Sequence, residues 1–202
     1  MQILPTLAFV VIIMTAMIIL IFRDWRINAG ALALQYLAAF ILVDVSWPTG
    51  MAVIKLIVGW MATVTIGFTC MRQQKSTAVE ESPASMFFRA VAGLLVILVM
   101  FILAPGVQSN IFPGLNLIIV QSGLMLLGMG LMQLGTTAEP YLTVFALLSL
   151  LSGFEIIHAG LERSSLLTGL LVLVNLGLAL VGVYFIGTGV EKGTEQEEEE
   201  VL

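Results

Sequence analysis

The sequence predicts an all-α fold, a polytopic transmembrane helical bundle of about seven spans with its N-terminus outside the membrane. Of the 202 residues, 59% are apolar and 10% are charged, whereas soluble globular proteins have about 45–50% apolar and about 25% charged residues. The mean hydropathy is +1.09. The apolar residues also come in runs of about 20, the length a helix needs to cross a hydrocarbon core of about 30 Å. A water-soluble globule is therefore excluded.

Seven apolar windows are long enough to span a bilayer, and each is bounded by charged residues or by helix breakers. The first window is not a signal peptide, because no basic residue precedes it and Arg23 and Arg26 follow it. We expect it to stay in the mature protein. The predicted spans are about 4–22, 28–45, 51–70, 86–104, 114–135, 140–160 and 165–186.

The basic residues of the connections predict the orientation, since short cytoplasmic loops are enriched in Lys and Arg. An external N-terminus puts six of them inside and leaves only Arg163 outside. The six are Arg23, Arg26, Arg72, Lys75, Arg89 and Lys192. We therefore expect a multi-pass protein of the cell inner (cytoplasmic) membrane.

The predicted organisation has two membrane blocks and a tail. Residues 1–71 form a front block of three spans, 72–85 a polar cytoplasmic loop, and 86–190 a rear block of four spans. Residues 104–114 are expected to form a longer outer loop, because they contain two Pro-Gly pairs. Residues 191–202 carry repelling acidic charges and little apolar area, so we expect a disordered tail.

Composition also limits the function. Nucleic-acid binding is excluded, because the formal net charge is −5. The single Cys and single His exclude a disulfide, a zinc cage, an iron–sulfur cluster and a bis-histidine haem. No nucleophile elbow, phosphate loop or dinucleotide fingerprint occurs. We therefore expect no cofactor and no self-contained enzyme.

Asp44 and Lys55 are charged residues inside apolar spans, where each charge is a functional candidate. They face each other across the short Trp47-Pro48 turn at similar depth. One interpretation is a hairpin ion pair. The other is that Lys55 takes part in proton movement and Asp44 modulates it.

The sixth span carries Ser152, Glu155 and His158 on one helical stripe. Glu155 would lie roughly 7 Å below the membrane surface, at 1.5 Å per residue, where desolvation favours the neutral carboxyl. A hydroxyl, a carboxyl and an imidazole in a row suit a proton relay. The alternative is a neutral carboxyl held by a hydrogen bond from a neighbouring helix.

Two further features of the rear block have simpler interpretations. Glu155 and His158 match the Glu-x-x-His spacing of di-iron bundles, but such sites need two of these motifs and two more Glu, so no metal site is expected. Asn175, near the middle of the seventh span, either holds helices together or belongs to the same polar track.

Several short motifs resemble a known family. Gly128-Met-Gly-Leu131, Ser152-Gly-Phe-Glu-Ile-Ile-His-Ala159 and Asn175-Leu-Gly-Leu-Ala-Leu180 resemble the three-helix K-type subunit of respiratory complex I, from about residue 114 onward. Arg26-Ile-Asn-Ala-Gly30, Gln35 and the lone Lys55 resemble its longer relative, hydrogenase-4 component E. Chain length and span count also fit that relative.

The resemblance implies a small, non-catalytic membrane-arm subunit that adds intramembrane ionisable groups to a proton- or Na⁺-conducting chain in a redox-driven oxidoreductase complex. Glu155 falls on the family's second-helix glutamate and Lys55 on the component E lysine. The last helix departs from the family pattern, because the family has a second glutamate in this helix and the region here offers only Asn175, two positions off a gapless match. An amide cannot carry a proton as a carboxylate does.

Three functions thus stay open. The first is a translocating or scaffold subunit whose partners are other membrane-arm subunits and the lipid bilayer. The others are a stand-alone small transporter and a purely structural membrane protein. The proton-relay candidates are Glu155, His158, Lys55, Asp44 and Asn175.

Overall fold

The computed structural model describes residues 3–73, 82–162 and 164–200. Within these residues the chain forms seven α-helices and no strand, and all seven are long and apolar enough to cross a membrane. The predicted helical bundle is confirmed. The helices are α1 (Ile3–Ile21), α2 (Trp25–Asp44), α3 (Thr49–Gln73), α4 (Pro83–Asn110), α5 (Leu117–Thr136), α6 (Pro140–Leu161) and α7 (Ser165–Glu200).

Local sequence signals explain where several helices begin. The Asp24 side chain accepts a hydrogen bond from the Arg26 N–H at 2.8 Å, and Asn116 accepts one from the Ile118 N–H at 3.1 Å. Both are N-caps, which satisfy a backbone donor that the first turn leaves free. Pro83 and Pro140 occupy the first turn of α4 and α6, where a missing N–H costs nothing.

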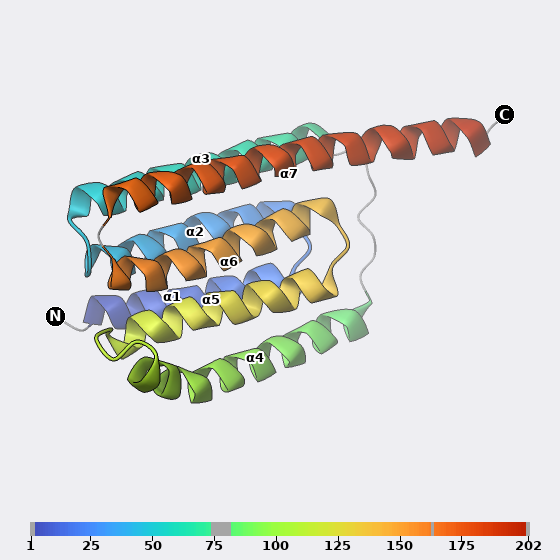
Figure 1. The fold of residues 1–202 in the computed structure, drawn as a ribbon. Helices are drawn as coiled ribbons and strands as arrows, with labels where there is room; N and C mark the ends of the chain where they lie inside the picture. The colour runs from blue at the N-terminus through green and yellow to red at the C-terminus, as the bar shows by residue number, and fades with distance from the viewer. Residues whose placement is uncertain (1–2, 74–81, 163, 201–202) are drawn as a thin grey trace.

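Helix α4 is longer than the sequence predicts. It continues through Pro105 to Asn110, so the expected loop at 104–114 is reduced to 111–116, and the final turns of α4 change direction (Figure 1). A proline removes one backbone hydrogen bond and bends a helix without always ending it. Here the chain regains its bonding afterwards, since the Ile111 N–H donates to the Val107 carbonyl at 2.9 Å.

The acidic tail also differs from the prediction. Helix α7 extends to Glu200, so 191–200 are helical instead of disordered, while 201–202 lie outside the described residues. The apolar span has already nucleated the helix, and Glu, Gln and Lys have high helix propensity, so propagation continues. Residues 74–81, which make up most of the predicted polar loop at 72–85, lie outside the described residues.

The helices form two layers of three, face to face (Figure 1). Helices α1–α3 make one layer and α5–α7 the other, with α1 against α5, α2 against α6 and α3 against α7. Helix α4 packs on the edge formed by α1 and α5. The four-span rear block of the sequence analysis thus consists of a peripheral helix, α4, and a three-helix layer.

Two glycines bring α5 and α6 into close contact. A Cβ added to Gly123 would lie 2.8 Å from the Gly153 carbonyl oxygen, and one added to Gly153 would lie 2.7 Å from the Gly123 oxygen. Only glycine permits this approach. This close contact makes α5 a firm support for α6, the helix that carries Glu155.

Candidate functional site

A buried ion pair lies between the two helical layers. Lys55 Nζ of α3 is 3.7 Å from Glu155 Oε2 of α6, and each side chain is only 7% exposed. At this distance the contact is an ion pair without a hydrogen bond, and no group among the described residues hydrogen-bonds to Lys55 Nζ. Both residues are candidates from the sequence, but their spacing along the chain does not predict that they form a pair.

The interpretation of Asp44 and Lys55 as a hairpin ion pair is therefore wrong, because Lys55 pairs with Glu155 instead. Asp44 ends α2 and is only partly buried, so water can solvate part of its carboxyl group. Lys55 lies about two turns into α3, and its four-carbon stem reaches across to α6. A buried charge gains most from an opposite charge that is equally desolvated, and Glu155 is that group.

Trp47 covers the lysine. Lys55 Nζ lies 4.8 Å from the centre of the Trp47 ring, a cation–π arrangement. The ring is buried, and its Nε1–H donates to the Glu162 carbonyl at 3.1 Å. Trp47, which lies in the turn before α3, thus folds over the ion pair.

His158 lies one turn after Glu155 on α6, as the predicted stripe requires. Its ring meets Trp47 edge to face, with centroids 6.5 Å apart, and stacks on Phe154 at 6.0 Å. Neither ring nitrogen has a hydrogen-bond partner among the described residues. Of the stripe, Ser152 and Glu155 line one cavity, and His158 lies beside Trp47.

That cavity has about 10 Å³ of space for the centre of a water molecule, roughly enough for one water. It lies between α2, α3 and α6 next to the ion pair. Its walls are Tyr36, Ala39, Phe40, Val43, Lys55, Ser152, Glu155 and Ile156.

Tyr36 connects the cavity with Asn175. Its hydroxyl donates to Asn175 Oδ1 of α7 at 3.2 Å, and both side chains are buried. Its ring packs on Gly59, where an added Cβ would come within 2.3 Å of a ring carbon. Sequence reasoning missed Tyr36. The available signal was a phenol in the middle of an apolar span, since a buried tyrosine hydroxyl usually has a hydrogen-bond partner.

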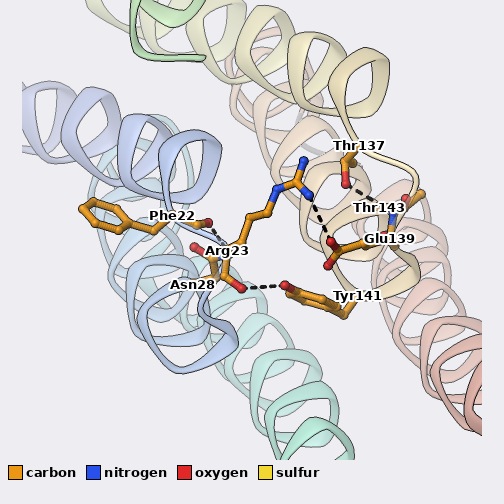
Figure 2. A network of polar contacts seen from close by, with 7 residues as sticks. All are labelled: Phe22, Arg23, Asn28, Thr137, Glu139, Tyr141 and Thr143. Carbon is orange, nitrogen blue, oxygen red and sulfur yellow. Dashed lines mark hydrogen bonds and ion pairs between the residues drawn. The ribbon is translucent and has the colours of Figure 1, made fainter. Parts of the chain in front are cut away.

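A second polar network joins the two layers at the opposite end (Figure 2). Arg23 Nη1, before α2, lies 3.0 Å from Glu139 Oε1, before α6. The Tyr141 hydroxyl donates to the Arg23 carbonyl, and Thr143 Oγ1 donates to the Glu139 carbonyl at 3.0 Å. The sequence does not predict this contact, because the two residues are 116 positions apart in the chain.

Chemically, the Lys55–Glu155 pair can exist as two charges or, after one proton moves from nitrogen to oxygen, as two neutral groups. Within 3–73, 82–162 and 164–200, no three His, Cys, Asp or Glu side chains gather closely enough to hold a metal ion. Of the predicted relay residues, the structure joins Lys55 to Glu155 directly and brings Asn175 close through Tyr36. It leaves Asp44 apart.

Comparison of the chain with protein-family models, with curated proteins and with solved structures gave no match.

Proposed function

We propose that this integral membrane protein is a subunit of a complex I-like or energy-converting hydrogenase assembly, where it contributes to proton or Na⁺ translocation and to the scaffold of the membrane arm. The observation that carries the translocation proposal is the buried Lys55–Glu155 pair. Ionisable side chains at membrane depth are costly and are functional candidates by default.

The geometry of the pair suits proton exchange better than it suits stabilisation of the fold. A buried ion pair stabilises a fold only when its charges have short contacts and further hydrogen bonds. Here the separation is 3.7 Å, and Lys55 Nζ has no hydrogen-bond partner among the described residues. In such surroundings the charged and the neutral form lie closer in free energy, so a moderate change nearby can move the proton.

The proposed place in a larger assembly rests on two supports. The first is the resemblance to hydrogenase-4 component E and the K-type subunit, in which Lys55 and Glu155 fall on family positions. The second is α4. In its most apolar stretch of 18 residues, only 11% of the residues are buried within the chain. Its outer face offers apolar side chains for lipid or for neighbouring membrane-arm subunits, and the assembly would lie in the inner cell membrane.

Co-purification and ion pumping test this proposal together. The chain is extracted in mild detergent, and its partners are identified. Redox-driven proton uptake is then measured in membrane vesicles for Lys55→Met and Glu155→Gln. We expect both variants to assemble and to lose most of the translocation.

The control is Glu162→Gln, which makes the same change at the exposed end of α6 and should keep the parental rate. Parental pumping by an assembled Glu155→Gln complex would contradict the translocation role and favour a purely structural one. A monodisperse chain that transports by itself would favour a stand-alone transporter.

A further inference from the structure

We propose that a chain of internal water molecules runs from the Lys55–Glu155 pair inward to Gln35 and Ser149, and that an apolar layer at Leu32 and Phe145 closes it toward the inner side. This inference rests on the proposed function and deepens it, because it describes how a proton approaches the pair. It also assigns roles to residues that the relay candidates did not include.

The first step is the small cavity beside the pair. Ala39 of α2 and Ser152 of α6 both line it, so these two helix faces meet there. Residues three or four positions earlier lie one turn inward on the same faces. These residues are Gln35 on α2 and Ser149 on α6.

Gln35 and Ser149 are at the same depth. At 1.5 Å per residue they lie about 15 Å and about 14 Å from the inner ends of two helices that run in parallel. The Gln35 side chain is completely buried and Ser149 is 3% exposed. Polar groups from both layers therefore lie at one depth near the middle of the bundle, one turn inward of the cavity.

Neither residue is satisfied by the protein. Within the described residues, Gln35 Oε1, Gln35 Nε2 and Ser149 Oγ have no hydrogen-bond partner. A buried polar atom without a partner costs about 1–3 kcal/mol, and native proteins commonly satisfy such atoms with ordered water that makes about three hydrogen bonds. Water at Gln35 and Ser149 would continue the chain that begins at Glu155.

The inward end of this chain meets apolar side chains. Leu32 and Phe145 have no exposed surface and belong to one apolar cluster. They lie roughly 8–11 Å from the inner ends of α2 and α6, between Gln35 and the inner polar group of Asn28, Arg23 and Glu139. Such a layer interrupts a water chain and keeps the membrane closed to protons.

Passive proton permeability of proteoliposomes tests the inference on the full chain alone. A potassium diffusion potential drives protons, and a trapped pH-sensitive dye reports them. Parental vesicles should be tight, and Phe145→Ala should raise the permeability several-fold. The matched control Phe154→Ala, on the same helix but half exposed, should stay tight.

Suppression by second changes identifies the path. Adding Gln35→Leu and Ser149→Ala to Phe145→Ala should abolish the leak. Adding Gln121→Leu and Ser122→Ala should leave it, because Gln121 is near the outer end of α5 and Ser122 Oγ already donates to the Ile118 carbonyl. A leak that survives the first pair of changes would overturn the proposed route.

A folded Phe145→Ala chain that does not leak would overturn the apolar layer. If that variant aggregates on size-exclusion chromatography, Leu32→Ala takes its place. In either case, a high-resolution structure of the parental protein should show water within hydrogen-bond distance of Gln35 and Ser149, and dry packing there contradicts the inference. Normal pumping by Glu155→Gln would instead contradict the proposed function, so the two failures are distinguishable.

Discussion

Lys55 of α3 is held between two very different groups, the Glu155 carboxylate at 3.7 Å and the face of Trp47 at 4.8 Å. The carboxylate comes from the second helical layer, and the indole comes from the turn that leads into α3 itself. The position of the lysine ammonium group therefore depends on the packing of α3 against α6 and on the conformation of the turn that contains Trp47.

The ion pair predicts a non-additive effect on stability. Glu155→Leu leaves Lys55 buried without its partner, and breaking a buried pair in this way costs about 3–5 kcal/mol. The double change Lys55→Met with Glu155→Leu removes both charges and should unfold later than Glu155→Leu alone. Thermal unfolding of the purified protein in mild detergent measures this. As a control, Lys55→Met with Asp44→Leu should show no such recovery.

The contact between the Trp47 indole and Lys55 predicts that the indole shields the lysine from solvent and from reagents. Trp47→Ala removes a cation–π contact worth about 0.5–2 kcal/mol and opens the outer face of Lys55. We expect a lower melting temperature and faster labelling of Lys55 by a small amine reagent, read by mass spectrometry. Trp60→Ala is the control, because Trp60 lies on α3 together with Lys55 and is 45% exposed. Equal labelling of both variants would disprove the cover.

The contact between Tyr36 and Gly59 predicts opposite effects for two glycines of α3. Gly59→Ala places a methyl group inside the Tyr36 ring volume, and overpacking of this kind costs about 1–3 kcal/mol. Gly67→Ala meets its nearest atom at 3.8 Å and gains helix propensity, so it should be neutral or stabilising. Unfolding curves distinguish the two, and a stable Gly59→Ala protein would mean that Tyr36 does not pack there.

The predicted orientation is testable at the two ends of α4. Ser85 and Ser109 are exposed near its beginning and end, so each accepts a cysteine without disturbing the core. In a Cys70→Ala background, an impermeant thiol reagent added outside intact cells should label Ser109→Cys and leave Ser85→Cys unlabelled. The reverse pattern would place the N-terminus inside.

The fold class and the spans follow from the amino-acid sequence alone. Apolar runs of about 20 residues must form helices in a bilayer, because every backbone polar group has to be satisfied within its own segment. This constraint is local, so seven windows predicted seven helices. It failed at Pro105 and in the tail, where helix continuation depends on neighbouring turns and not on the residue type alone.

Which charged side chains form a pair depends instead on how the helices pack. Lys55 and Asp44 are close in sequence, and Glu155 lies 100 residues further along the chain, so local spacing favoured the wrong carboxylate. Packing the layer α1–α3 on the layer α5–α7 turns one face of α6 toward α2 and brings a long lysine stem within reach. The same packing buries Tyr36 and Gln35 between helices. What a buried polar side chain contacts depends on the helix faces around it, and those faces come from helices that are distant in sequence.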